Sequence, residues 1–166
     1  MIREVAFLSQ AGAEAMRPLP REGIISITGS GYPPATLRRG WRRVLRLVFD
    51  DIEKPFFGAI NFDTVHAEAI LCWLDEVEGK VDKVFVHCHA GRSRSAAVAK
   101  FIAEKYDLSG GIRVYEEHNG RVLRSLTRRG RSSSGPPGSG ESVKIPANMD
   151  SNRRQELSHR SRILFP

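Results

Sequence analysis

One segment of the sequence carries residues that can do chemistry together: HCHAGRSRS, at residues 87–95. It separates Cys88 from Arg94 by five residues, with Gly91 at the centre. A cysteine thiolate is a strong nucleophile, and a planar guanidinium can hold two phosphoryl oxygens at once, which a lysine cannot. Gly91 allows the backbone to curl without a Cβ in the way. These residue types and this spacing predict a loop that binds a phosphate dianion and passes its phosphoryl group to sulfur.

The elements on either side of this segment explain how it would attract an anion. Residues 84–86 are wholly apolar and predict a buried strand, and residues 93–106 are rich in alanine and predict a helix. A loop that enters the first turn of a helix aims backbone N–H groups at one point, where the helix dipole adds positive potential. That potential would also lower the pKa of the Cys88 thiol. The expected phosphate-binding residues are His89, Ala90, Gly91, Arg92, Ser93 and Arg94.

Phosphoryl transfer needs a proton donor for the leaving oxygen, and the segment LRLVFDD, residues 45–51, offers two carboxyl groups. Its apolar residues alternate along an expected strand over residues 44–49, and Asp51 continues that alternation. Asp51 would then lie at the carboxyl end of the strand, where α/β sheets assemble their sites. Asp51 is therefore the expected general acid, with Asp50 as the second candidate.

Two further residues of the segment are expected to support the site. Ser95 would hydrogen-bond the Cys88 sulfur and make it a better leaving group when water hydrolyses the intermediate, and His87 would orient the loop from below. The run His87-Cys88-His89 does not predict a metal site, because adjacent strand residues point to opposite faces and no second pair of ligands follows. We expect neither a metal nor a cofactor.

The remaining elements must position these residues. Apolar patterns predict strands over residues 23–28, 44–49 and 84–86, longer helices over 62–77 and 93–106, and shorter helices over 112–117 and 121–126. Strands separated by helices indicate an α/β fold, with a central, mostly parallel sheet flanked by helices. On the first of these helices, Cys72 beside Trp73 is expected in the core and His66 on the surface.

The composition changes after Leu126. The stretch over residues 127–142 consists of Arg, Ser, Gly, Pro, Thr and Glu and has no apolar side chain to bury. We expect a catalytic domain at 1–126 and a flexible, disordered tail at 127–166. The net charge of +7 supports this division, because residues 127–166 hold eight basic and three acidic side chains while residues 1–126 hold 18 and 16.

Composition also limits the class of protein. With 40% hydrophobic residues the 166-residue chain can bury a core, and no apolar run approaches the roughly 20 residues that span a bilayer. The first residues, MIREVAFLSQ, lack the continuous apolar stretch of a signal peptide, and two cysteines are too few for a disulfide scaffold. We therefore expect a soluble, cytoplasmic protein with no membrane partner.

The segment HCHAGRSRS resembles the His-Cys-x5-Arg-Ser signature of the cysteine-dependent protein tyrosine phosphatase superfamily. The short domain is similar to the compact dual-specificity-like branch. Together with LRLVFDD and NGRVLRSL, at residues 119–126, it resembles small bacterial and phage predicted protein tyrosine phosphatases. The likeness covers roughly residues 20–126, and Arg92 departs from it by placing a charge where relatives often carry an apolar residue.

This resemblance implies a phosphatase-like fold and hydrolysis of phosphate monoesters through a phosphocysteine on Cys88. Its implied catalytic residues are Cys88, Asp51, Arg94 and Ser95, and its implied partner is a phosphorylated protein or another phosphomonoester. Two alternatives stay open: a phosphate-binding module that turns over poorly, and an RNA 5′-phosphatase or nucleic-acid-associated protein that uses the basic tail. Nucleic acid would bind only through that tail, with a steep dependence on salt.

Overall fold

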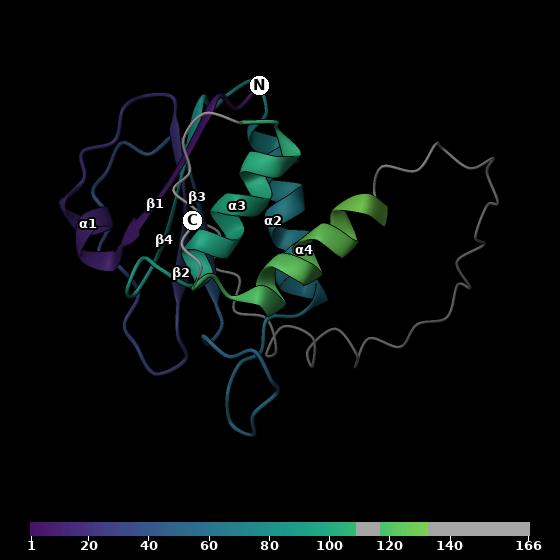
Figure 1. The fold of residues 1–166 in the computed structure, drawn as a ribbon. Coiled ribbons are helices and arrows are strands. Elements are labelled where there is room, and N and C mark those ends of the chain that lie inside the picture. Colours follow the sequence, from purple (N-terminus) through teal and green to yellow (C-terminus); the bar gives the residue numbers. More distant parts are fainter. Residues whose placement is uncertain (109–116, 133–166) are drawn as a thin grey trace, which may run out of the picture.

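In the computed structural model, which describes residues 1–108 and 117–132, the chain forms an α/β fold with one sheet between helices (Figure 1). The sheet is the frame on which the site is built. The elements in chain order are β1 (Glu4–Ser9), α1 (Gln10–Ala15), β2 (Glu22–Thr28), β3 (Arg43–Val48), α2 (Thr64–Val77), β4 (Lys83–Cys88), α3 (Arg94–Lys105) and α4 (Gly120–Ser132).

The four described strands are all parallel and lie in the order β1-β4-β2-β3. β4 is therefore central, and its Val86 lies between Phe7 of β1 and Ile25 of β2. Because the carboxyl ends of parallel strands meet at one edge, the residues that follow β3 and β4 are brought together there. The predicted α/β fold is confirmed, and the described part of the sheet is wholly parallel.

Helices cover both faces of the sheet unequally. Figure 1 shows α2, α3 and α4 together on one side and the short α1 on the other. The larger side holds the main core, in which Ile25 and Ile27 of β2 pack with residues of the three helices. On the opposite face Ile24 packs with Phe85 and Ala13 in a smaller cluster. The alternation along β2 thus supplies both cores, as expected for a strand buried on each face.

α2 confirms the predicted helix, but two of its residues lie in surroundings that differ from those expected. It begins at a capping box in which Asp63 and His66 bond each other's backbone N–H groups. His66 is not a plain surface residue, because its ring packs against Phe49 and Phe62 and its Nε2 lies 3.1 Å from the Val48 carbonyl oxygen. Cys72 is exposed and not in the core, since it lies on the solvent side of the helix while its neighbour Trp73 is buried.

Two elements at the N-terminus were not predicted from the sequence. β1 lies at the edge of the sheet and is largely half-buried, so its hydrophobic pattern is weak. α1 has six residues and is capped by Ser9, whose hydroxyl accepts from the Gly12 N–H. Such short elements leave little periodic signal in a sequence.

The last helix runs further than the sequence indicates. α4 continues six residues past the expected boundary at Leu126, so residues 127–132 are helical and not part of a flexible tail. Its last turns have partners on other helices, because Gly130 lies against the Phe101 ring and Arg129 pairs with Glu68. The expected helix at 112–117 falls almost entirely, and the rest of the tail at 133–166 falls wholly, outside the described residues. Among the described helices, none is long and apolar enough to cross a bilayer.

Candidate active site

The loop between β4 and α3 holds the predicted cysteine and arginine at its two ends. Cys88 is the last residue of β4 and Arg94 the first of α3. Both side chains are buried, whereas His89, Ala90 and Arg92 are exposed at the top of the loop. The structure thus sets a thiol and a guanidinium at the base of a loop whose outer residues face solvent. We refer to residues 88–94 as the cysteine loop.

Gly91 is required by the path of the cysteine loop. Its φ of +69° lies in the left-handed region, which residues with a Cβ rarely adopt. A Cβ there would lie 2.7 Å from the Leu8 carbonyl oxygen and closer still to the Ser9 nitrogen. The loop therefore presses directly on the end of β1, where the Gln10 N–H also donates to the His89 carbonyl oxygen at 3.2 Å.

The surroundings of Cys88 favour its thiolate. Burial acts to raise the pKa of the thiol. Hydrogen bonds from the Ser95 hydroxyl and from the backbone N–H groups of Ser95 and Arg92, together with the charge of Arg94, outweigh burial and hold the pKa below its ordinary value. The Cys88 Sγ lies 3.1 Å from the Ser95 Oγ, the contact that the sequence analysis anticipated.

The buried Arg94 side chain is held in place through one of its guanidinium nitrogens. Its side chain is 7% exposed, and its Nη1 donates to the Phe49 carbonyl oxygen at 2.8 Å. Its Nε is buried and has no hydrogen-bond partner among the described residues, although the Asp51 Oδ2 lies 3.9 Å away. Buried donors without a partner are rare in proteins, so this N–H is ready to bind an anion in the cysteine loop.

Asp51 reaches the cysteine loop, but by a different route from the one predicted. β3 ends at Val48, so strand alternation does not extend to residue 51. Instead the chain turns after Phe49, and the Asp51 Oδ1 accepts from the Ser93 hydroxyl at 2.8 Å. It accepts a second hydrogen bond, at 2.9 Å, from the side-chain amide of Asn119. The Asp51 side chain remains 39% exposed beside the loop.

Asp50 has a different environment. Its carboxylate accepts three hydrogen bonds of 2.8 Å, from the N–H and hydroxyl of Ser30 and from the N–H of Ile60. Burial acts to raise its pKa, but these hydrogen bonds and the charge of Arg94 hold the pKa below the ordinary value. A carboxyl group that stays ionised is a poor proton donor, and this one ties two loops together.

His87 lies under the cysteine loop, inside the sheet. Its ring is fully buried, and its Nε2 lies 2.7 Å from the Oγ of Ser26, the residue beside it on β2. Burial lowers the pKa of His87 to about 4, so the ring is neutral near pH 7. Its position beneath the loop agrees with a supporting role and keeps it away from solvent.

The sequence did not predict the partners of two side chains beside the cysteine loop. The ring of Tyr32 lies 4.9 Å from the ring of His89, tilted by 32°, and is more than half exposed. Arg92 does not stand as a free charge, because its guanidinium pairs with Glu117 at 3.0 Å. Only contacts between segments distant in the sequence reveal these partners.

Asn119 opens the segment NGRVLRSL, but the sequence did not predict its contact with the candidate acid. It directly precedes α4, and its side-chain oxygen accepts from the Val122 N–H at 3.1 Å, as a helix cap does. Its amide nitrogen donates to Asp51, so one side chain caps the helix and holds the candidate acid. The available signal was an asparagine directly before an amphipathic helix.

Comparisons with known proteins are sparse. No protein-family model and no curated protein matches the chain. Among solved structures, the chain is similar to the crystal structure of human tyrosine phosphatase-like serine/threonine/tyrosine-interacting protein, with 19% identity and a TM-score of 0.45 over 69% of this chain and 79% of that one. This likeness is too distant to assign a function. The resemblance carried by HCHAGRSRS therefore stays a prediction.

Proposed function

We propose that the chain hydrolyses phosphate monoesters through a phosphocysteine formed on Cys88. One observation carries the proposal: a buried cysteine with a lowered pKa lies in the same strand–loop–helix turn as a buried arginine whose Nε has no hydrogen-bond partner among residues 1–108 and 117–132. The thiolate supplies the nucleophile. The Arg94 guanidinium and the N–H groups of the cysteine loop would hold the three non-bridging oxygens of the phosphoryl group.

In the first step the Cys88 Sγ attacks phosphorus and the bond from phosphorus to the ester oxygen breaks. Protonated Asp51 gives its proton to that oxygen, which leaves as an alcohol or phenol. In the second step a water attacks phosphorus, Asp51 takes a proton from the water, and the sulfur–phosphorus bond breaks. The contact with Ser95 stabilises the thiolate that leaves, and inorganic phosphate is released.

The environments of the two adjacent aspartates support Asp51 as the acid. Asp51 borders the cysteine loop and is partly open to solvent, whereas Asp50 is occupied by Ser30 and Ile60. The Asp51 Oδ2 also lies 3.9 Å from the Arg94 Nε. We assign Asp50 to closing the loop that carries Asp51.

The substrate class that fits the rim is an aryl phosphate, as in phosphotyrosine. Tyr32 offers an exposed ring at the loop, tilted against the His89 ring, against which a second aromatic ring can lie. A phosphorylated protein is thus the proposed partner. A lower KM for aryl than for alkyl phosphate esters would support this choice, and equal values would count against it.

One observation favours a second candidate, a phosphate-binding module without turnover. Asp51 already accepts hydrogen bonds from Ser93 and Asn119, so its carboxylate is engaged before substrate arrives. Such a module would bind phosphate esters at the cysteine loop and release them unchanged.

The experiment that separates these candidates is hydrolysis of para-nitrophenyl phosphate by the full chain in the presence of a chelator. The chain supplies a matched control, because Cys72→Ser removes an exposed thiol and Cys88→Ser removes the buried one. Turnover by the wild type and by Cys72→Ser, with none by Cys88→Ser, is expected. A folded wild type that binds phosphate without turnover would favour the binding module.

A further inference from the structure

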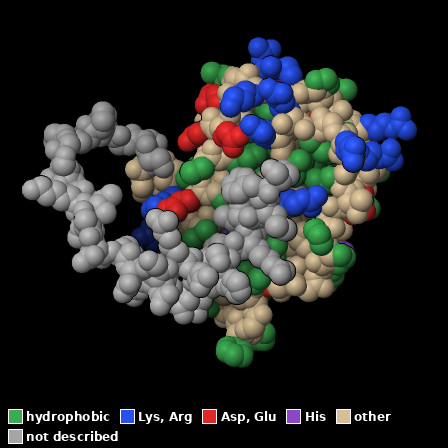
Figure 2. All heavy atoms as spheres, turned by 180° about the vertical axis from the view of Figure 1, so that it is seen from behind, with side chains coloured by type: hydrophobic (Ala, Val, Ile, Leu, Met, Phe, Trp, Pro, Cys, Tyr) green, Lys and Arg blue, Asp and Glu red, His purple; other side chains and the backbone are tan. Residues whose placement is uncertain are grey.

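The segment between β3 and α2, residues 50–62, which we call the aromatic loop, projects two phenyl rings into solvent. Phe56 is 71% and Phe57 is 99% exposed, and Gly58 beside them has a φ of +85°. Figure 1 shows this loop below the body of the molecule, and Figure 2 shows hydrophobic side chains projecting at that lower end. The rings form a convex tip and do not line a groove. Exposed aromatic residues of this kind indicate a surface that is covered by a partner.

The aromatic loop is anchored at its neck and beside α4. The Asp50 N–H donates to the Ile60 carbonyl oxygen at 2.7 Å, and the Ile60 N–H donates back to the Asp50 carboxylate at 2.8 Å. At the start of α4 the Gly120 N–H donates to the Glu53 carboxylate at 2.9 Å. The tip is therefore carried on a closed loop next to the first turn of α4.

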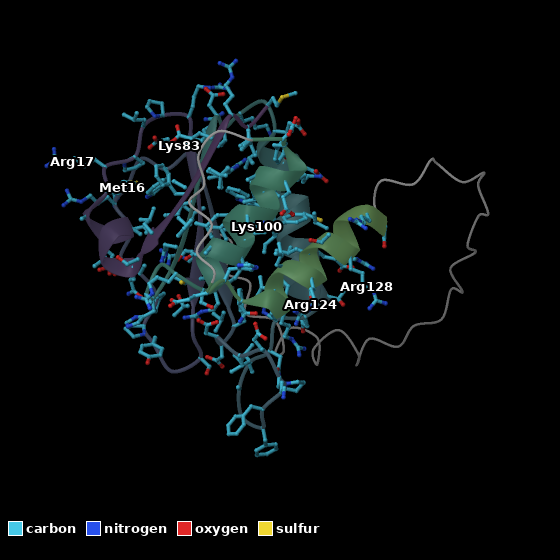
Figure 3. All side chains as sticks on the ribbon, in the orientation of Figure 1. Met16, Arg17, Lys83, Lys100, Arg124 and Arg128 are labelled. Atoms are coloured by element: carbon cyan, nitrogen blue, oxygen red, sulfur yellow. The ribbon has the colours of Figure 1, made fainter. Side chains whose placement is uncertain are left out.

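α4 presents positive charge along one side. Arg124, Arg128 and Arg131, which we call the arginine stripe, are spaced by four and three residues and are all exposed. Within residues 1–108 and 117–132, no carboxylate lies within ion-pair distance of them, whereas Glu68 pairs with Arg129. Figure 3 shows Arg124 and Arg128 on the outer side of α4.

Charged side chains also lie on the aromatic loop. Lys54 is exposed on the loop itself. The loop also carries three carboxylates, and each has a hydrogen-bond donor: Ser30 and Ile60 for Asp50, Ser93 and Asn119 for Asp51, and the Gly120 N–H for Glu53. Beside the loop, Glu117 pairs with Arg92. The surface from the loop to α4 thus combines protruding rings with basic side chains that have no acidic partner within the described ranges.

We propose that the aromatic loop and the arginine stripe dock the protein on an anionic lipid bilayer. Phe56 and Phe57 enter the boundary between headgroups and acyl chains, and the guanidinium groups bind lipid phosphates. A bilayer accepts a convex pair of rings at any point of its surface, whereas a protein partner needs a pocket shaped for them. The sequence analysis expected no membrane partner because no apolar run is long enough to span a bilayer. Peripheral binding needs no spanning helix, so that reasoning does not apply to it.

The test is co-sedimentation of the full chain with vesicles of phosphatidylcholine alone and of phosphatidylcholine mixed with phosphatidylglycerol. We expect binding to the mixed vesicles only, weakened by salt. Phe56→Ser with Phe57→Ser should reduce it at least ~10-fold, and Arg124→Gln with Arg128→Gln should reduce it as well. The matched control is Leu19→Ser with Arg17→Gln, since both are exposed and Figure 3 places Arg17 on the opposite side of the molecule.

A spectroscopic readout separates insertion from simple charge attraction by residues 133–166. A tryptophan introduced by Phe57→Trp should shift its emission to the blue and be protected from a soluble quencher on mixed vesicles. Unchanged binding by the double phenylalanine variant, or an equal loss in the control variant, would overturn the proposal. So would a folded wild type that binds no vesicles or binds only proteins. Cys88→Ser should bind vesicles like the wild type, so this test succeeds or fails independently of the proposed hydrolysis.

Discussion

The side-chain amide of Asn119 donates to the carboxylate of Asp51 across 2.9 Å, while its oxygen accepts from the Val122 N–H. The contact joins residues 68 positions apart in the sequence. The start of α4 and the position of the candidate acid are therefore set by one side chain. Asn119 acts through Asp51 and is a positioning residue.

Replacing Asn119 should separate its two roles. Asn119→Ala removes both the cap and the contact with Asp51, and we expect a loss of about 1 kcal/mol of stability with slower hydrolysis of esters that have poor leaving groups. Asn119→Ser keeps a capping oxygen but does not reach as far, so its stability should recover while its hydrolysis stays slow. Thermal unfolding and kcat for activated and unactivated esters measure the two effects. Full recovery of kcat in Asn119→Ser would limit Asn119 to capping.

The pH dependence of Cys88 should follow from its lowered pKa. Because the thiolate forms at a lower pH than in a free thiol, alkylation by iodoacetamide should remain fast on the acidic side of the ordinary thiol pKa. Ser95→Ala removes the hydroxyl that hydrogen-bonds the Cys88 sulfur, so the rising limb of the alkylation profile should move to higher pH. The profile is measured in a Cys72→Ser background, which removes the exposed thiol. An unshifted limb would show that Ser95 does not stabilise the thiolate.

Replacement of Asp51 should mainly affect hydrolysis, whereas replacement of Asp50 should mainly affect stability. Asp51→Asn should slow hydrolysis of esters with poor leaving groups by roughly 10²–10⁴-fold and leave the melting temperature nearly unchanged. Asp50→Asn should lower the melting temperature, because the donors of Ser30 and Ile60 lose a charged acceptor. The reverse pattern would make Asp50 the acid.

The stability that Asp50 contributes should depend on pH in one direction. Its folded-state pKa lies below the ordinary value of 3.8, so the contribution is full above that value and is lost as pH falls through the lowered pKa. The difference in melting temperature between wild type and Asp50→Asn should therefore shrink in acid. A difference that is independent of pH would indicate that charge is not the source.

Two glycines offer a matched pair for testing the cysteine loop. Gly91→Ala combines a positive φ with a Cβ that meets the backbone of Leu8 and Ser9, and we expect it to cost about 1–3 kcal/mol and to abolish phosphate binding. Gly31→Ala adds a Cβ with no atom within 4 Å and should change stability by less than about 0.5 kcal/mol. Thermal unfolding and phosphate titration distinguish them. Normal binding by Gly91→Ala would mean that the end of β1 does not shape the loop.

Much of the site was predictable because its chemistry lies within one short segment. The pattern of apolar residues on either side of Cys88, Gly91 and Arg94 predicts a strand before the loop and a helix after it, and the structure confirms both elements. Asp51 was predicted by an alternation that the structure does not continue, since β3 ends at Val48. Its position depends on Ser93 and Asn119, which only the folded chain brings near it.

The residues that escaped prediction share a dependence on long-range packing. β1 is an edge strand whose half-buried side chains give little alternation. The final turns of α4 are polar, and their helical state is accounted for by Phe101 and Glu68 on two other helices. The polar composition of residues 127–132 predicts a flexible tail, because composition alone does not show that Phe101 and Glu68 pack against this segment.

The sheet order has a consequence for how the protein is made. β1 and β2 leave the ribosome first, yet they do not pair with each other, because β4 lies between them. Until residues 83–88 have been synthesised, the nascent chain carries two strand edges without their partner, which are exposed to pairing with other chains. The strand that ends in Cys88 is thus the one that joins β1 to β2 and completes the sheet. Any truncated chain that is long enough to complete the sheet therefore also contains the cysteine.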